Sequence, residues 1–299
     1  MKNQTKAYLF ALTSVFLWST VASAFKISLR YLSPAELLFY ANIVSIFVLF
    51  VLLIVQKKLH LFSTLDSAAW KSSILFGFLS PFLYYLIVIT SYDLLPAQQA
   101  QPLNYTWAIT LSLMSVPLLG QRLKPMEMVA VLVSYIGVLV ISTEGDVFSL
   151  RFENPFGVFL ALISTVVWAT YWIVNTRDRR DPVFGLFLNF VCSLPLIALY
   201  LGITVGFRQV ETAGLLGAAY IGTFEMGVAF AAWLSAMKLT SSTARIANLI
   251  FISPFLSLFL IHFLVGETIM ISSVIGLFFI VAGLLLQTMA GPAGAEIKK

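Results

Sequence analysis

The sequence predicts an all-α membrane protein with ten transmembrane helices, arranged as two inverted five-helix repeats. Three observations support this fold class. Apolar residues make up 60% of the 299 residues and charged residues only 10%, whereas soluble domains have about 45–50% and about 25%. The apolar residues gather in long runs, and the two halves of the chain resemble each other. The composition excludes a water-soluble enzyme and a disordered chain.

Ten apolar runs are long enough to cross a bilayer, which takes about 20 residues in a helix. Strands of a membrane barrel alternate over only about 10 residues, so the runs favour helices. In chain order the runs cover residues 7–25, 35–55, 70–91, 97–118, 125–142, 155–175, 183–205, 212–236, 243–264 and 269–289. The connections are short and leave no room for a separate soluble domain.

Lysine and arginine are unevenly distributed between the two sides of these runs. Of the 18 basic residues, 14 fall on the side of the two termini, and the other four are Lys26, Arg30, Arg151 and Arg208. Basic residues in short loops mark the cytoplasmic side. We therefore expect a multi-pass membrane protein with both termini in the cytoplasm. Orientation explains the net charge of +5, so no nucleic-acid partner is expected.

The second half of the chain repeats features of the first at nearly constant spacing. The matching pairs are Trp18-Ser19-Thr20 with Trp168-Ala169-Thr170, Gly77 with Gly222, Leu119-Gly120-Gln121 with Val265-Gly266-Glu267, and Gly137 with Gly283. The expected units are a first repeat over 1–148, a second over 149–291 and a cytoplasmic tail over 292–299. Because five is odd, the second repeat must cross the membrane in the opposite sense, an architecture found in many secondary transporters.

These residues resemble the bacterial drug/metabolite transporter superfamily, in its ten-helix type built from two five-helix domains. The resemblance covers essentially the whole chain. It rests on the repeated tryptophan of each half and on the segment that ends each half, Leu264-Val265-Gly266-Glu267 with Gly276 and Gly283. The first half departs from the pattern, because it has Gln121 where the family usually has Glu and Ala130 where Gly276 stands.

Within the superfamily, the stretch from Gln98 to Trp107 is most similar to the aromatic amino acid exporters. The resemblance implies an inner-membrane exporter with a central cavity between its halves. Small-molecule substrates and the lipid bilayer are then the expected partners, and a monomer is the working expectation. No cofactor or metal is implied.

Several aromatic and polar residues lie inside the apolar runs rather than at their ends, where aromatic anchors usually sit. Aromatic walls can bind an aromatic side chain by stacking or an organic cation by cation–π attraction. Polar groups inside a span face the bundle or a cavity. The candidate substrate-binding residues are Trp18, Asn42, Tyr84, Gln98, Gln101, Tyr105, Trp107, Trp168, Asn189 and Asn248. For Trp18, Tyr84, Tyr105, Trp107 and Trp168 the alternative role is packing or a position at the membrane interface.

Glu225 is a carboxylate near the middle of a span, which makes it a functional candidate by default. Three roles stay open: proton coupling, a structural hydrogen bond and direct substrate contact. The sequence holds no His-Glu-x-x-His motif and only two histidines, which disfavours a membrane-embedded enzyme. The expected function is export of small metabolites, mainly amino acids with an aromatic preference. The alternative is efflux of multiple drugs or organic cations.

Overall fold

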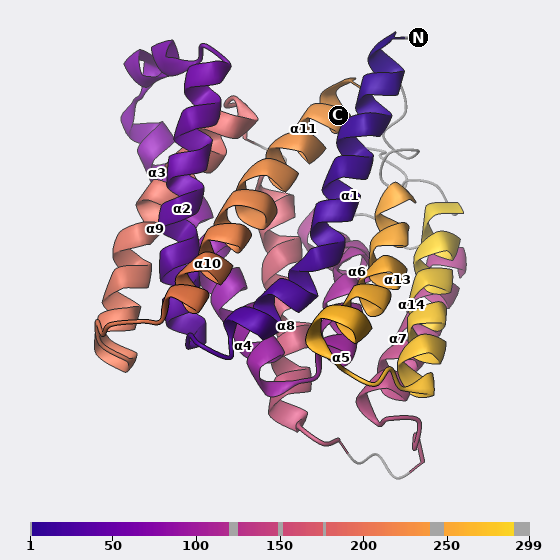
Figure 1. Ribbon diagram of the computed structural model, residues 1–299. Coiled ribbons are helices and arrows are strands. Elements are labelled where there is room, and N and C mark those ends of the chain that lie inside the picture. The colour runs from indigo at the N-terminus through magenta and orange to yellow at the C-terminus, as the bar shows by residue number, and fades with distance from the viewer. Residues whose placement is uncertain (1, 120–124, 149–151, 176–177, 240–247, 290–299) are drawn as a thin grey trace.

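The computed structural model describes residues 2–119, 125–148, 152–175, 178–239 and 248–289. These residues form helices and no β-strand (Figure 1). Eight described helices are long and apolar enough to span a membrane, and a shorter apolar helix covers Ser253–Val265. The chain is therefore an all-helical multi-pass membrane protein.

The elements follow one another along the two halves of the chain. The first half contains α1 (Lys2–Ser28), α2 (Pro34–Val55), η1 (Leu59–Thr64), α3 (Ser67–Gly77), η2 (Phe78–Leu83), α4 (Tyr84–Leu94), α5 (Ala97–Tyr105), α6 (Trp107–Leu119) and α7 (Pro125–Ser142). The second contains α8 (Pro155–Asn175), α9 (Pro182–Thr204), α10 (Thr212–Tyr220), η3 (Ile221–Ala229), α11 (Phe230–Leu239), η4 (Asn248–Ile252), α13 (Ser253–Leu260), η5 (Ile261–Val265) and α14 (Ile271–Met289).

Two of the expected runs look different in the structure. The run over 97–118 is divided at Thr106 into α5 and α6, so it is not one of the eight long helices. Residues 243–247 of the run over 243–264 lie outside the described residues, and its remainder begins as a 3₁₀ segment at Asn248. Pro102 and Pro117, which cannot donate a backbone hydrogen bond, lie in the divided run.

Side chains at the helix ends explain where α2 and α9 begin. Ser33 and Glu36 form a capping box around Pro34, which has the backbone angle of a first helical residue. Asp181 accepts hydrogen bonds from two backbone N–H groups of the first turn of α9. Its carboxylate also pairs with Lys58 at 2.8 Å, which ties the end of α2 to the start of α9.

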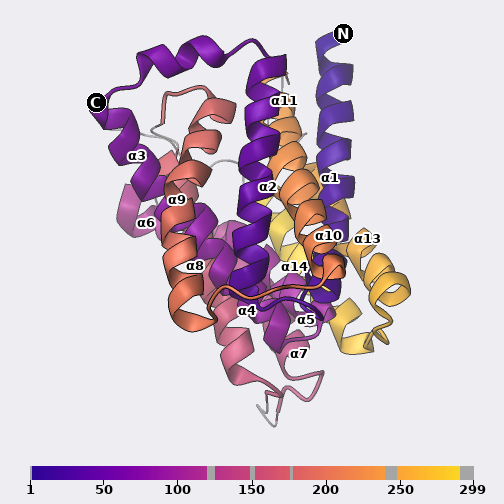
Figure 2. The ribbon, with the colours of Figure 1, turned by 60° about the vertical axis from the view of Figure 1, so that its left-hand side comes forward.

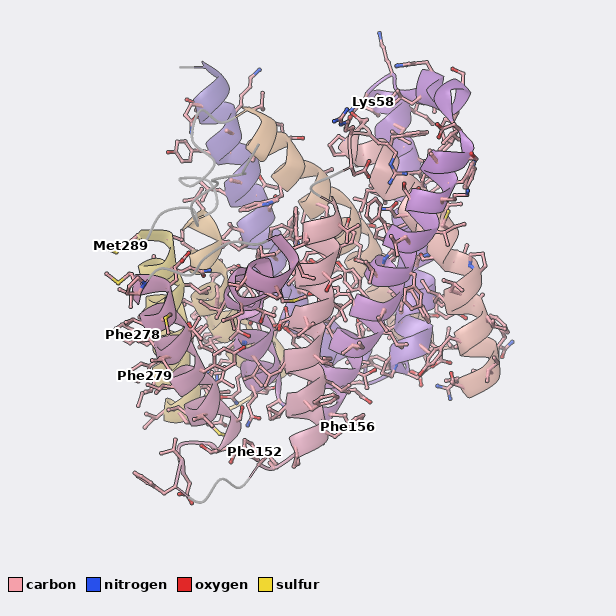
Figure 3. The ribbon with its side chains drawn as sticks, turned by 180° about the vertical axis from the view of Figure 1, so that it is seen from behind. Lys58, Phe152, Phe156, Phe278, Phe279 and Met289 are labelled. Atoms are coloured by element: carbon pink, nitrogen blue, oxygen red, sulfur yellow. The ribbon has the colours of Figure 1, made fainter. Side chains whose placement is uncertain are left out.

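The connections gather at two faces of the bundle. The start of α1, the α2–α3 connection and Lys58 lie at one face, called here the N-terminal face (Figures 1 and 3). The α1–α2 and α9–α10 connections lie at the opposite face. There Arg208 donates hydrogen bonds of 2.6 and 2.9 Å to Glu36, and this carboxylate raises the pKa of the guanidinium above its ordinary value.

Large apolar side chains cover the outside of the bundle. Phe278 is 65% exposed and Met289 is 77% exposed, and both project away from α14 (Figure 3). Phe156 at the start of α8 is likewise exposed. An apolar exterior this extensive marks a membrane-facing surface in a multi-helix protein.

Small residues bring α7 and α14 into close contact, and the two helices lie side by side (Figures 1 and 2). Gly137 packs against the backbone oxygen of Gly276, and Gly283 packs against Ser134. Small residues allow such approaches between membrane helices. The halves also exchange contacts, because α2 packs on α9, α1 on α11 and α4 on α8. The aromatic cavity described below therefore lies among helices from both halves.

Candidate functional site

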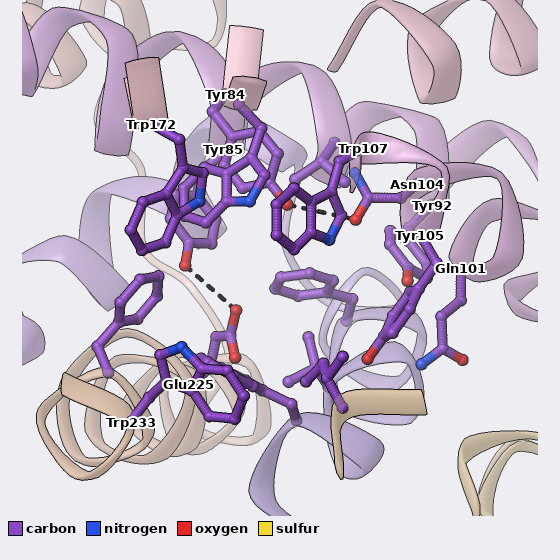
Figure 4. A pocket seen from close by; sticks show the side chains of 17 residues that line it. Tyr84, Tyr85, Tyr92, Gln101, Asn104, Tyr105, Trp107, Trp172, Glu225 and Trp233 are labelled. Carbon is purple, nitrogen blue, oxygen red and sulfur yellow. Dashed lines mark hydrogen bonds between the residues drawn. The ribbon is translucent and has the colours of Figure 1, made fainter. Parts of the chain in front are cut away.

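A central cavity of about 160 Å³ lies among α1, α4, α5, α6, α8, η3, α11 and η4 (Figure 4). Its volume is far above the roughly 10–15 Å³ that a single water requires. Its walls are Trp18, Val21, Phe25, Tyr84, Tyr85, Val88, Tyr92, Gln101, Asn104, Tyr105, Trp107, Trp168, Trp172, Glu225, Phe230, Trp233 and Ile250. The cavity is therefore apolar and aromatic, with a few polar groups, as binding sites for small molecules usually are.

The aromatic wall is built around Trp168 on α8. Its ring stacks on Tyr84 with centroids 4.5 Å apart and on Tyr171 with centroids 5.3 Å apart. Trp172, one turn further along α8, meets Trp168 edge to face at 5.8 Å. Such pairs hold their rings in fixed orientations. The wall thus offers flat faces to an aromatic or cationic guest.

Hydrogen bonds fix several polar groups of the wall. The Tyr84 hydroxyl donates to Asn104 at 3.3 Å, and the Asn104 amide donates to Ser164 at 2.9 Å. The Tyr105 hydroxyl donates to Ser253 of α13 at 2.8 Å. These bonds join the α4–α5 part of the first half to α8 and α13 of the second.

Glu225 places a carboxyl group in this apolar setting. It lies in η3, whose widened turns belong to a helix type often found at functional sites. The Tyr85 hydroxyl donates to Oε1 at 3.2 Å (Figure 4). Oε2 is buried and has no hydrogen-bond partner among the described residues. The Nε1 of Trp172 and the Oε1 of Gln101 are buried without a partner in the same sense.

The described wall residues include no lysine, arginine or histidine. Tyrosine hydroxyls are neutral near pH 7. Among the described wall residues, Glu225 is therefore the one whose side chain can carry a formal charge. The described residues hold no cluster of three metal-ligating side chains. The wall therefore offers one carboxyl group and aromatic faces to a guest molecule.

The sequence-predicted residues divide into two groups. Trp18, Tyr84, Gln101, Tyr105, Trp107, Trp168 and Glu225 all line the cavity. Asn42 does not, because it is fully buried between α2 and α9, where its amide donates to the Phe190 carbonyl at 3.2 Å. Gln98 lies at the opposite face, where its side chain bonds to Thr268 and Met270. The side chain of Asn248 lies outside the described residues.

Asn189 lies at a smaller cavity of about 90 Å³, which shares Trp172 and Phe230 with the central one. Arg180 is the basic residue there. Its guanidinium binds Asp178 at 2.7 Å, and it donates to the Ala69 carbonyl, the Ser73 hydroxyl and Asn189. The donors of Arg180 are thus bound to other groups of the protein. Through these bonds Arg180 holds α3 and α9 together beside this cavity.

Ten of the 17 wall residues were not among the candidates predicted from the sequence, and Tyr85, Asn104, Phe230 and Trp233 are four of these. Tyr85 and Asn104 adjoin predicted residues in the chain, and the spacing of aromatic residues within their runs was an available signal. Phe230 and Trp233 meet Trp18 at 5.7 and 5.3 Å. Only the packing of α1 on α11 brings them to the cavity.

Polar contacts hold the helix ends together at the opposite face. The Lys26 ammonium donates to the carbonyls of Tyr92 and Leu95 at the end of α4, at 2.9 and 3.0 Å. The Glu267 carboxylate accepts from the backbone of Ala97 and Gln98 at the start of α5. A carboxylate at a helix N-terminus is favourable. The contacts thus join α1, α4, α5 and the α13–α14 connection at this face.

A family model described as the EamA-like transporter family matches residues 5–143 and again residues 155–289. An uncharacterized transporter of Clostridium kluyveri is 26% identical over 190 residues, which are 61% of this chain and 60% of that protein. The uncharacterized transporter YvbV of Bacillus subtilis is 22% identical over 95% of this chain and 92% of its own.

One solved structure, titled "Crystal structure of protein", shares the fold. Its TM-score is 0.68 at 21% sequence identity, and the alignment covers 96% of this chain and 97% of the other.

Proposed function

The chain belongs to the EamA-like transporter family, and on that premise we propose that it exports small metabolites through the central cavity. We take amino acids with aromatic side chains as the first substrate class. The observation that carries this proposal is the wall of Tyr84, Trp168 and Trp172, whose rings are held in fixed orientations. Aromatic guests stack favourably on such rings.

The proposed mechanism is alternating access between two inverted five-helix repeats, over 1–148 and 149–291, with 292–299 as a cytoplasmic tail. The two separate family matches, one in each half, support the duplication. α5 and α6 would together supply one crossing, and the segment that ends with α13 and η5 another. Membrane transporters of this kind place their site between the repeats. We further propose the bacterial inner membrane as its location, with cytoplasmic termini.

Within this proposal Trp18, Tyr84, Tyr105, Trp107 and Trp168 contact the side chain of the substrate, and Gln101 contributes a hydrogen bond. Asn42, Gln98 and Asn189 would act through packing, because other protein groups already bind them. Glu225 is the candidate for proton coupling.

Efflux of organic cations is the second candidate function. It is favoured by the carboxyl group of Glu225 and by the lack of basic residues among the described wall residues. Both functions are transport, the activity that the family implies.

Uptake of labelled solutes into proteoliposomes, with and without a pH gradient, tests the proposal. The panel holds phenylalanine, threonine, glutamate and an organic dication. Preference for phenylalanine supports amino acid export, and transport of the dication alone favours cation efflux. A transport rate that is the same with and without the pH gradient would show that Glu225 does not couple transport to protons. Uptake no greater than in empty liposomes for every solute would overturn transport itself.

A further inference from the structure

Three wall residues of the central cavity carry a buried polar atom without a partner among the described residues. Oε2 of Glu225 and Oε1 of Gln101 are acceptors, and Nε1 of Trp172 is a donor. Buried polar groups without partners are rare in folded proteins and call for an explanation. Because all three residues belong to the wall of one cavity, a bound molecule is an explanation that serves them together.

The charged groups of the wall determine the sign of the charge that this ligand carries. A carboxylate is costly in an apolar cavity unless an opposite charge pairs with it. The described wall residues offer no lysine, arginine or histidine for this role, so a cationic ligand would supply the opposite charge when Glu225 is ionised. The Tyr85 hydroxyl occupies Oε1, which orients the carboxyl group and leaves Oε2 for an ammonium group.

The same balance argues against a carboxylate on the ligand. In an α-amino acid the carboxylate is attached to the carbon that bears the ammonium, so binding the ammonium at Glu225 brings two negative groups close together. Like charges repel strongly in a medium of low dielectric constant. The Trp172 N–H is a single neutral donor and suits a neutral acceptor, such as an ester or amide carbonyl.

We propose that Glu225 and Trp172 make this cavity selective for aromatic amines that lack a free carboxylate. The ammonium pairs with Glu225, the ring stacks within the aromatic wall and a neutral acceptor bonds to Trp172. This inference rests on the proposed transport function and replaces its first substrate class, the aromatic amino acids, with their decarboxylated or carboxyl-blocked relatives.

Binding to the purified protein in nanodiscs tests the proposal. Five of the six tryptophans line the cavity, so quenching of intrinsic fluorescence reports occupancy. The probes are 2-phenylethylamine, phenylalanine methyl ester, phenylalanine and 3-phenylpropionate. We expect the amine and the ester to bind at least tenfold more tightly than phenylalanine, and 3-phenylpropionate not to bind. Trp172→Phe should weaken the binding of the ester more than the binding of the amine.

Glu225→Gln should abolish the preference for the amine, whereas Asp93→Asn should keep it. Asp93 is the matched control, because it is an exposed carboxylate on α4 outside the cavity. Phenylalanine binding as tightly as 2-phenylethylamine, or no binding of any probe, would overturn the proposal, and the wild-type series decides this even where Glu225→Gln fails to fold.

Transport assays distinguish a failure of the proposed amine selectivity from a failure of the proposed transport function. Proteoliposomes that accumulate phenylalanine faster than 2-phenylethylamine would refute the amine selectivity and leave export of amino acids intact. Proteoliposomes that accumulate neither would refute the proposed function as well.

Discussion

The Tyr85 hydroxyl on α4 donates a hydrogen bond of 3.2 Å to the Glu225 carboxyl group in η3, across 140 residues of sequence. The bond joins the two halves of the chain at the wall of the central cavity. It also leaves one carboxylate oxygen without a described partner. A group held in this way is ready to bind a cation that enters the cavity.

Replacing Glu225 with glutamine should preserve the bond from Tyr85 but remove the charge. Removing one partner of a buried, hydrogen-bonded charge pair costs about 2–5 kcal/mol, so we expect transport of a cationic aromatic solute to fall by at least about tenfold. Initial rates in proteoliposomes measure this effect. Asp93→Asn serves as the control, and a Glu225→Gln protein that transports at the full rate would show that the carboxylate is structural.

Trp168→Ala should impair transport of phenylalanine more than that of threonine. The tryptophan ring stacks on Tyr84 and Tyr171, and an aromatic pair contributes about 0.5–1.5 kcal/mol beyond the burial of area. We expect the ratio of phenylalanine to threonine uptake to fall by roughly twofold to twelvefold, as that range of energies implies. An equal loss for both solutes would identify Trp168 as a packing residue.

Gly137→Val should destabilise the protein without altering its choice of solute. A side chain at this position meets the backbone oxygen of Gly276 and the side chain of Ile280 at 2.9 Å. Overpacking of this kind costs about 1–3 kcal/mol. Thermal unfolding in detergent measures the loss. Gly202→Ala is the control, because its added atom meets Phe207 only at 3.4 Å; equal unfolding temperatures for the two variants would contradict the prediction.

Accessibility of single cysteines tests the proposed topology. In a Cys192→Ala background, we place cysteine at Ser63 or Arg179 near the N-terminal face, or at Phe148 or Gln209 near the opposite face; all four positions are exposed. A reagent that cannot cross the membrane should label only Phe148→Cys and Gln209→Cys in intact cells. Labelling of Ser63→Cys from outside would show that the proposed orientation or the proposed number of crossings is wrong.

All five aromatic candidates line the cavity, whereas among the amide candidates whose side chains are described only Gln101 does. Trp18, Tyr84 and Trp168 lie well inside apolar runs, and an aromatic side chain there has few roles besides packing and binding. Amides have more partners available. Asn42 bonds to a carbonyl of α9, and Gln98 bonds to backbone groups before α14. Helical spacing shows that such an amide faces inward, but not which neighbour satisfies it.

The fold shows the same division between local and long-range information. Long apolar runs indicated the helices, because the cost of burying an unpaired backbone in lipid leaves few other structures. The division at Thr106 and the widened turns of η3 depend on contacts between helices, which the pattern of one run does not contain. The pairing of Tyr85 with Glu225 has the same origin.

The central claim is that solute crosses the protein through this cavity, and blocking the cavity tests it. Val21 lines the cavity, so we would replace it with cysteine in the Cys192→Ala background and modify it with a bulky thiol reagent. Modification should stop uptake of phenylalanine and 2-phenylethylamine into proteoliposomes, and saturating solute should slow the modification. Phe148→Cys, which is 98% exposed as phenylalanine, should stay active after the same treatment. Full transport by the modified Val21→Cys protein would show that the solute takes another path.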